Sequence, residues 1–334
     1  MDIRTLSQTI EKLTENKKGI LAIDESKSTA NDKRLKPLRI PETEESRRRF
    51  RDIFLTAPDI EKYLTGVILY DETIRQMSDT GRSFVNELYS KEIVVGIKVD
   101  EGAHHDERFP NELVTGGLSG LSTRLHEYFQ MGARFAKWRA VIEIDEKKGI
   151  PTKEAIRENA ERLARYAELC QEANIVPMIE PEVLIDGNHS MKRAEEVIGD
   201  TLRVVFEELS VRGVSLPHTI LKTSMVLPGN TSGEKMDAQR VAVATARALE
   251  QNVPSDIGAI VFLSGGQSYV DAIQNLNEIV KQELPWHITF SYARAIQQPV
   301  LEIWNGQDEN KEIAREKYIE ILKELSLASQ GLLK

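Results

Sequence analysis

The chain has 334 residues, of which 40% are hydrophobic and 29% charged, and its 53 acidic and 44 basic side chains leave a net charge of −9. This composition is typical of a globular protein and excludes collagen-like, disulfide-rich and wholly disordered chains. The acidic balance argues against nucleic acid as a partner, because nucleic-acid binders are usually basic. No segment has the apolar length of a membrane span or a signal peptide, so we expect a cytoplasmic protein that does not bind membranes.

The chain opens with an amphipathic segment, residues 1–16, in which Leu6, Ile10 and Leu13 share one face of an expected helix. Short apolar runs then alternate with longer amphipathic stretches. The runs are rich in Ile, Val, Leu and aromatic residues, as strands buried on both faces should be. They lie at 19–24, 64–70, 93–100, 133–144, 174–184, 219–226, 259–266 and 287–293. Helical patterns lie at 43–58, 119–131, 151–173, 235–251, 267–283 and 309–328.

Eight strand-like runs that alternate with helices predict an α/β fold, the (β/α)8 TIM barrel. We expect a single domain over residues 1–334, with an N-terminal helical extension, barrel strands within about 19–293 and a C-terminal helical region over about 295–334. An open, doubly wound sheet is the alternative. It is disfavoured because neither Gly-x-Gly-x-x-Gly nor the phosphate-loop motif follows any of the runs.

Charged and polar residues lie in or at the end of most of these apolar runs. A charge inside an apolar strand is costly to bury unless it is paired, so any one of them could belong to a structural ion pair. In a barrel, however, the carboxyl ends of the strands converge on the site of chemistry. The residues concerned are Asp24, Lys98, Asp100, Lys137, Arg139, Glu180, Glu182, Lys222, Ser264, Ser291 and Arg294.

Lys222 is the candidate nucleophile among them. A lysine attacks a carbonyl carbon only as the neutral amine, and burial and nearby cations both favour that form. Lys222 lies in the apolar run ILKTSMV, and a barrel would bring other cations toward it. Imine formation also needs an acid to expel water, for which Glu180 on the neighbouring strand is suited, and Asp24 could act as a second base. A snorkelling or ion-paired lysine is the structural alternative.

Two segments could bind phosphate. The Ser-Gly-Gly turn at residues 264–266 follows a strand and leads toward a helix, where free backbone N–H groups can bind an anion. Arg294 could clamp the same group with two hydrogen bonds. A second basic set, Lys33 and Arg34 after the first run and Arg47 in the next helix, would suit a substrate with a phosphate at each end. A solvated surface is the alternative for Lys33 and Arg34.

Taken in order from about residue 10 to residue 330, the strand motifs resemble those of class I fructose-bisphosphate aldolase. They are GILAIDES, GVILYDET, GIKVDEG, FAKWRAV, IVPMIEPEVLIDGNH, ILKTSMVLPG, VFLSGGQS and FSYARAIQ. The resemblance implies a (β/α)8 barrel that is usually a homotetramer and needs no metal or other cofactor. It also implies reversible cleavage of fructose 1,6-bisphosphate to dihydroxyacetone phosphate and glyceraldehyde 3-phosphate through a lysine Schiff base, in glycolysis and gluconeogenesis.

The resemblance further implies roles for single residues. Lys222 resembles the Schiff-base lysine, and Glu180 resembles the acid/base of imine chemistry, with Glu182 beside it. Asp24 resembles the base that removes the C4 hydroxyl proton, and Lys137 resembles a supporting lysine. The residues that match other active-site polar positions are Ser26, Lys98 and Arg139. Those that match the phosphate site of the dihydroxyacetone half are Ser264, Gly265, Gly266, Ser291 and Arg294, and those that match the region of the other phosphate are Thr29, Lys33, Arg34 and Arg47.

Among the departures from the family pattern, three concern the nucleophile, the phosphate site and the end of the sequence. Thr223 and Ser224 follow the candidate lysine where the family usually has Pro-Asn, which alters hydrogen bonding beside the nucleophile. Ala293 stands where the family usually has Gly, before the phosphate-binding arginine, and its methyl group could crowd the site or demand a different φ. The sequence ends at ASQGLLK, without the tyrosine-ended tail of the animal enzymes.

Three other functions stay open at this point. A zinc-dependent aldolase would use histidine ligands, and only His104 and His105, followed by Asp106 and Glu107, have a spacing that suits a metal. A non-catalytic scaffold is supported by the departures, although every charged residue that the mechanism needs is present. A different substrate, such as sedoheptulose bisphosphate or fructose 1-phosphate, would keep the same chemistry.

Overall fold

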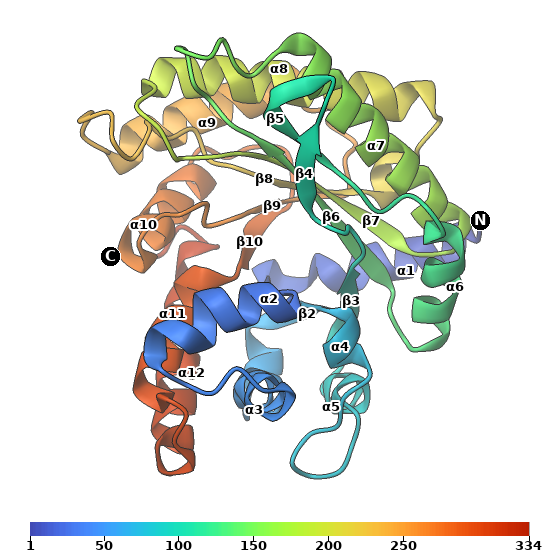
Figure 1. Cartoon of the computed structure of the whole chain (residues 1–334), viewed down its shortest axis with the longest axis vertical. Coiled ribbons are helices and arrows are strands. Elements are labelled where there is room, and N and C mark those ends of the chain that lie inside the picture. The colour runs from blue at the N-terminus through green and yellow to red at the C-terminus, as the bar shows by residue number, and fades with distance from the viewer. Residues whose placement is uncertain (334) are drawn as a thin grey trace.

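Eight parallel strands close into a barrel in the computed structural model, which describes residues 1–333 (Figure 1). In order around the barrel they are β1 (Gly19–Ala22), β2 (Leu64–Leu69), β3 (Val94–Lys98), β6 (Phe135–Ile142), β7 (Val176–Val183), β8 (Ile220–Thr223), β9 (Ala259–Phe262) and β10 (Ile288–Tyr292), which pairs again with β1. Each strand lies inside one of the eight predicted runs. The predicted (β/α)8 barrel is therefore confirmed, and the open doubly wound sheet is wrong.

Helices form at every predicted helical segment and surround the barrel. They are α1 (Ile3–Leu13), α3 (Glu44–Leu55), α6 (Leu121–Gln130), α7 (Lys153–Glu172), α9 (Ala238–Asn252), α10 (Tyr269–Val280) and α12 (Lys311–Ala328). The predicted C-terminal helical region contains α11 (Arg294–Trp304) and α12, and its last residue, 334, lies outside the described residues. Within residues 1–333 no helix combines the length and the apolar character needed to cross a bilayer.

Several helices and one hairpin of the fold were not predicted. Helix α8 (Met191–Val211) lies beside α7 and α9 at the top of the view in Figure 1, and α5 (Phe84–Ser90) lies beside α3 at the bottom. The strands β4 (Ala103–Asp106) and β5 (Phe109–Thr115) form an antiparallel hairpin between β3 and α6. Two one-turn helices, α2 (Lys27–Ala30) and α4 (Asp71–Ile74), follow β1 and β2.

Helix α1 packs against the amino-terminal ends of the barrel strands. Its Leu6 and Leu13 join an apolar cluster inside the barrel that includes Phe135 from β6. Gly96 of β3 leaves room for that ring, because a Cβ at this position would lie 2.3 Å from Phe135 Cζ. Apolar side chains thus fill the barrel interior at the amino-terminal ends of the strands, and the polar strand residues gather at the carboxyl-terminal ends.

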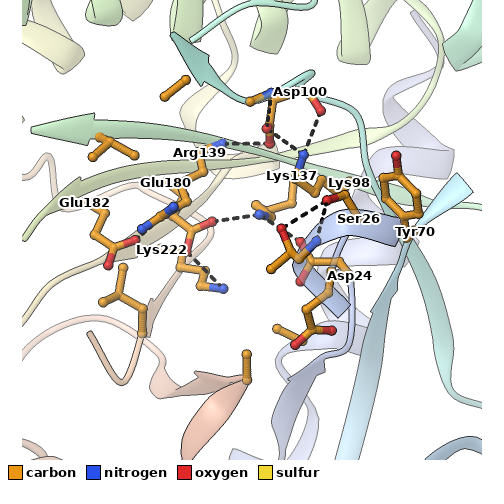
Figure 2. Close-up of a pocket in the computed structure, with 18 of the residues that line it drawn as sticks. Asp24, Ser26, Tyr70, Lys98, Asp100, Lys137, Arg139, Glu180, Glu182 and Lys222 are labelled. Atoms are coloured by element: carbon orange, nitrogen blue, oxygen red, sulfur yellow. Dashed lines mark hydrogen bonds and ion pairs between the residues drawn. The ribbon is translucent and has the colours of Figure 1, made fainter. Parts of the chain in front are cut away.

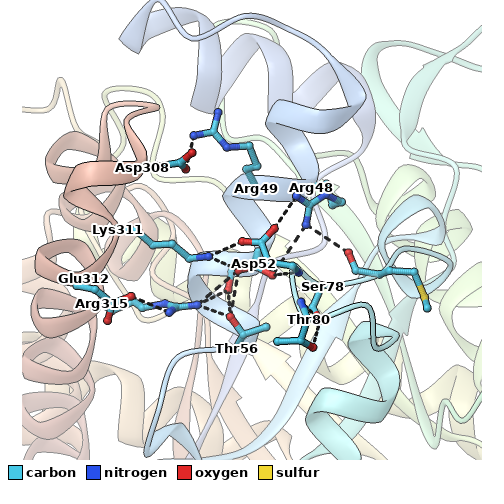
Figure 3. A network of polar contacts seen from close by, with 12 residues as sticks. Arg48, Arg49, Asp52, Thr56, Ser78, Thr80, Asp308, Lys311, Glu312 and Arg315 are labelled. Atoms are coloured by element: carbon cyan, nitrogen blue, oxygen red, sulfur yellow. Dashed lines mark hydrogen bonds and ion pairs between the residues drawn. The ribbon is translucent and has the colours of Figure 1, made fainter.

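A buried carboxylate ties α12 to α3 (Figure 3). Asp52 of α3 is 1% exposed, and its Oδ2 accepts hydrogen bonds from Lys311 Nζ at 2.7 Å and Arg315 Nη2 at 3.5 Å. Its Oδ1 accepts a hydrogen bond from the backbone N–H of Asp79 at 3.0 Å and lies 3.9 Å from Arg48 Nη1. The Asp52 carboxylate of α3 therefore contacts both α12 and the loop before α5.

Candidate active site

A cavity of about 990 Å³ opens at the carboxyl-terminal ends of the barrel strands. All but one of the predicted site residues line it, and they come from seven of the eight strands or the segments that follow them. They are Asp24, Ser26, Thr29, Lys33, Arg34, Lys98, Lys137, Arg139, Glu180, Glu182, Lys222, Ser264, Gly265, Gly266, Ser291 and Arg294. The fold thus brings together residues that the sequence spreads over 271 positions, as parallel strands in a barrel require.

Two lysines share one carboxylate at the centre of the cavity (Figure 2). Lys222 Nζ lies 3.1 Å from Glu180 Oε1, and Lys137 Nζ lies 3.1 Å from Glu180 Oε2. Lys137 has a second carboxylate partner, Asp24, at 2.8 Å. All four side chains are nearly excluded from solvent. Lys222 therefore faces one carboxylate, whereas Lys137 is held between two.

The charges of this cluster control its protonation. Burial would raise the pKa of Asp24, but the positive charges of Lys137, Lys222 and Lys98 outweigh it and lower that pKa to about 2. The pKa of Glu180 is lowered in the same way, against its burial, by Lys137 and Lys222. The pKa of Lys137 is raised, because Asp24 and Glu180 outweigh the effect of its burial. At neutral pH the cluster thus holds two carboxylates and a firmly protonated Lys137.

Asp100 organises the side of the cavity near β3 and β6. Lys98 Nζ lies 2.6 Å from Asp100 Oδ1 and also donates to the Asp100 carbonyl oxygen at 2.7 Å. The other carboxylate oxygen accepts the backbone N–H of Arg139 at 3.2 Å. The Arg139 guanidinium forms an ion pair with Glu182, as Figure 2 shows. Asp100 was recognised in the sequence as a strand-end residue, but no role was predicted for it.

The turn after β9 offers an anion site. Gly265 and Gly266 have φ of 51° and 86°, in the left-handed region that favours glycine. A Cβ at Gly266 would lie 3.5 Å from Arg294 Nη2, so the guanidinium lies directly beside the turn. Within residues 1–333 no carboxylate lies within 4 Å of Arg294, and Ser291 Oγ is buried without a hydrogen-bond partner. Free backbone donors, a free hydroxyl and an unpaired cation together suit a phosphate group.

The segment after β1 contributes hydroxyl and basic groups to the cavity. Ser26 caps α2, because its Oγ accepts the Thr29 N–H at 3.2 Å, and it also donates to Thr29 Oγ1 at 3.0 Å. Lys33 is exposed at the rim. Arg34 is buried and engaged, since its Nη2 lies 2.8 Å from Glu25 Oε1 and its Nε donates to Gln297 at 2.6 Å. Lys33 is thus freer than Arg34 to meet a ligand.

Arg47 is the one predicted site residue that the structure does not bring to the cavity. Its guanidinium binds Glu72 at two points, with Nε 2.8 Å from Oε1 and Nη2 2.7 Å from Oε2. A third bond, of 3.2 Å, runs to Asn31 Oδ1. Arg47 is 6% exposed and supports the segment that carries Lys33 from behind, so its expected contact with a substrate phosphate does not fit the geometry.

Several residues at the cavity rim were missed. Tyr70 and Asp71 follow β2, and Arg75 Nη1 forms an ion pair of 2.7 Å with Glu127 of α6. Arg124 donates to the Val99 carbonyl at 2.9 Å. The sequence did contain a signal for two of them, because the motif LYDET places polar groups at the end of the second apolar run.

The departures near the site differ in how their backbone and side chains are placed. Ala293 has a φ of −110° and a ψ of −87°, outside the main helical and extended regions, so this residue adopts an unusual backbone conformation directly before α11. Ser224 directs its hydroxyl to the backbone of β7. His104 and His105 lie on the exposed strand β4, and among residues 1–333 the His, Cys, Asp and Glu side chains form no group of three or more arranged to hold a metal ion.

Comparisons with known proteins agree on the family and on the overall fold. A family model described as fructose-bisphosphate aldolase class-I matches residues 5–334. The chain is 45% identical over 334 residues to a probable fructose-bisphosphate aldolase class 1 from Xylella fastidiosa, covering 99% of each. It is 42% identical over 316 residues to fructose-bisphosphate aldolase 4, cytosolic, from Arabidopsis thaliana, covering 94% of this chain and 80% of that protein. A solved fructose-bisphosphate aldolase from Plasmodium falciparum, in complex with TRAP and a small-molecule inhibitor, superposes with a TM-score of 0.97 at 42% identity, covering 99% of this chain and 95% of that one.

Proposed function

Because the chain belongs to the class I fructose-bisphosphate aldolase family, we propose that Lys222 is the residue that forms its Schiff base. The enzyme is a lyase that reversibly cleaves fructose 1,6-bisphosphate to dihydroxyacetone phosphate and glyceraldehyde 3-phosphate, a reaction of glycolysis. The observation that carries the assignment is the difference between the two central lysines. Lys137 lies between two carboxylates that keep it protonated, whereas Lys222 faces Glu180 alone.

Glu180 is positioned to serve both halves of imine formation. Its Oε1, 3.1 Å from Lys222 Nζ, can accept a proton from the ammonium group and leave a neutral amine. The amine attacks the C2 carbonyl carbon of the sugar to give a carbinolamine. Glu180 then returns the proton to the C2 hydroxyl, which leaves as water, and the protonated imine forms. Lys137 stays charged throughout and stabilises the oxygen that becomes negative in the first step.

Asp24 is the proposed base for cleavage of the carbon–carbon bond. Its low pKa keeps it ionised at neutral pH, so it can accept the C4 hydroxyl proton. The C3–C4 bond breaks, the aldehyde product leaves, and the electron pair remains on the imine as an enamine. Protonation at C3 and hydrolysis of the imine then release dihydroxyacetone phosphate and restore Lys222. Glu182, paired with Arg139, is proposed to shape the wall beside Glu180.

A bisphosphate fits the arrangement better than a monophosphate. The turn at residues 264–266, with Ser291 and Arg294, offers a phosphate site at the end of β9 and β10. Lys98 lies at the end of β3, four strands from β9 around the barrel, and Ser26, Thr29 and Lys33 line the same cavity from the segment after β1. We propose that these two groups hold the two phosphates of fructose 1,6-bisphosphate. A kcat/KM for fructose 1-phosphate equal to that for the bisphosphate would contradict the second site.

Borohydride trapping tests the proposed nucleophile. The protein is mixed with dihydroxyacetone phosphate, reduced, and analysed by intact and peptide mass. We expect one triose phosphate adduct, on the peptide that contains Lys222. The Lys222→Arg variant should stay folded and lose both the adduct and turnover, because arginine remains protonated and forms no imine. An adduct on Lys137 instead would contradict the assignment.

We also propose that the enzyme needs no metal or other cofactor, because a protonated imine supplies the electron sink that a metal would otherwise provide. We propose a homotetramer in the cytoplasm, as the family resemblance implies, with sugar bisphosphates and triose phosphates as its ligands. The name of the Arabidopsis relative, a cytosolic aldolase, supports that compartment. Light scattering of the purified protein should give four times the chain mass, and a monomeric mass would contradict the tetramer.

A further inference from the structure

The ladder between β7 and β8 is interrupted where the proposed catalytic pair lies. β7 pairs with β6 at all eight of its residues, Val176–Val183. With β8 it pairs only at two positions, Met178 opposite Ile220 and Ile179 opposite Leu221. The next pair in this register would be Glu180 opposite Lys222. The acid and the nucleophile therefore lie on either side of a gap in the backbone hydrogen bonds.

Pro181 explains this gap. To continue the parallel ladder past Leu221, the residue after Glu180 would have to donate its backbone N–H toward β8. Proline has no N–H, so the rung cannot form. Strand residues alternate the edge toward which their backbone groups point, so the next β7 residue whose N–H and C=O can face β8 is Val183.

The Ser224 side chain forms hydrogen bonds to β7 in place of the missing backbone hydrogen bonds from β8. Its Oγ accepts the Val183 N–H at 3.1 Å and donates to the Val183 carbonyl oxygen at 3.0 Å. Ser224 is 5% exposed, so without this hydroxyl both backbone groups would be buried with no water to replace it. One side chain thus joins β7 and β8 just beyond the catalytic pair.

We infer that Ser224 is a positioning residue that holds the Lys222 amine within proton-transfer distance of Glu180. This inference rests on the proposed roles of those two residues. Glu180 moves with β6, to which β7 is fully paired, and so keeps its contact with Lys137. Lys222 moves with β9, to which β8 is paired from Ile220 to Thr223. Loss of the Ser224 bridge should therefore disturb the contact of Glu180 with Lys222 and spare its contact with Lys137.

The test compares Ser224→Ala with a matched loss of a buried hydroxyl elsewhere in the barrel. Thr65→Val is the control, since Thr65 of β2 is 4% exposed and donates to the Leu13 carbonyl at 3.0 Å, at the far end of the barrel. The readout is the single-turnover rate of borohydride-trappable adduct on Lys222 with dihydroxyacetone phosphate, together with kcat and KM for fructose 1,6-bisphosphate. Ser224→Thr, which keeps the hydroxyl, tests rescue.

We expect Ser224→Ala to slow adduct formation by about 10- to 100-fold, because small displacements of reacting groups have effects of that size. KM should change less than about threefold, since the phosphate-binding residues are untouched. Ser224→Thr should recover most of the rate, and Thr65→Val should react like the wild type. If Ser224→Ala does not fold, Ser224→Cys, with a weaker donor and acceptor, should give a smaller slowing of the same step.

Adduct formation at the wild-type rate in folded Ser224→Ala, or an equal slowing in Thr65→Val, would overturn the inference. So would a defect confined to KM. Failure of the proposed function is a separate result, because it would show as the absence of any Lys222 adduct in the wild-type enzyme. A wild-type adduct with an unaffected Ser224→Ala variant would leave the proposed function intact and reject only the positioning role.

Discussion

Replacing Lys137 by methionine should remove the cation on which two buried carboxylates depend. In the native cluster, the difference between the usual pKa of 3.8 for Asp24 and its value of about 2 is worth about 2.5 kcal/mol of stability at neutral pH. Lys137 is the largest contributor to that lowering, and its loss also takes a cation from Glu180. Breaking a buried ion pair by removing one partner usually costs about 3–5 kcal/mol, so we expect Lys137→Met to lose about 3 kcal/mol.

The stability lost in Lys137→Met should be greater at pH 7 than at pH 5. In the wild type, the contribution of Asp24 is fully present above the unfolded pKa near 3.8 and is lost only as pH falls toward about 2. In Lys137→Met, burial raises the pKa of Asp24 and only the weaker effects of Lys222 and Lys98 oppose it, so we expect the folded variant to bind a proton more readily than its unfolded chain. Its deficit relative to the wild type should then be largest at pH 7 and shrink toward pH 5.

Urea unfolding at pH 7 and pH 5, followed by tryptophan fluorescence, measures both effects. Trp138 lies next to the substituted residue and is fully buried, so it reports on this part of the barrel. Lys98→Met is the matched control, because Lys98 also pairs with a carboxylate, Asp100, but is 16% exposed and should lose less. An unchanged midpoint would refute the electrostatic reasoning, and a deficit equal at both pH values would show that packing, not charge, is responsible.

Three further outcomes are expected. Asp52→Asn should lower the free energy of unfolding by about 3 kcal/mol, because Lys311 and Arg315 lose their buried counter-charge; unchanged thermal unfolding would count against the network in Figure 3. Arg294→Ala should lower kcat/KM for fructose 1,6-bisphosphate about 100-fold by loss of charge-assisted hydrogen bonds, with the unfolding midpoint preserved, and unaltered steady-state kinetics would speak against the phosphate site. Prolonged incubation with a strong chelator should leave turnover unchanged, and a loss restored by added zinc would contradict the Schiff-base proposal.

The sequence was sufficient to predict the barrel because its strands are buried on both faces and so appear as continuous apolar runs. The hairpin of β4 and β5 gives no such run, since it includes the exposed polar pair His104 and His105. Helix α8 does have the helical pattern in its sequence, with Ala194, Ile198 and Leu202 four residues apart on its buried face. The apolar pattern therefore indicates which segments are buried, and it does not indicate exposed strands such as β4.

The candidate site could be predicted as far as it consists of residues at the carboxyl ends of the strands, because a barrel brings these ends together. Strand-end residues such as Glu180 and Lys222 had to converge once the strands were known. The partner of a charge is harder to predict, because pairing depends on side chains far apart in the sequence. Arg47 illustrates this limit, since Glu72, 25 positions away, accepts two hydrogen bonds from its guanidinium. The bridge from Ser224 to Val183 was equally invisible, as it depends on the register of two strands.

The contacts that close the molecule join the two ends of the chain. β1 pairs with β10, and Asp52 binds Lys311, which follows 259 residues later. During synthesis the N-terminal segments emerge first, so β1 and α3 must wait for their partners until almost the whole chain has left the ribosome. Until then β1 presents an open strand edge, the kind of surface that recruits other chains. The pairing of β1 with β10 thus leaves one edge of the first strand without its partner for nearly the full time of translation.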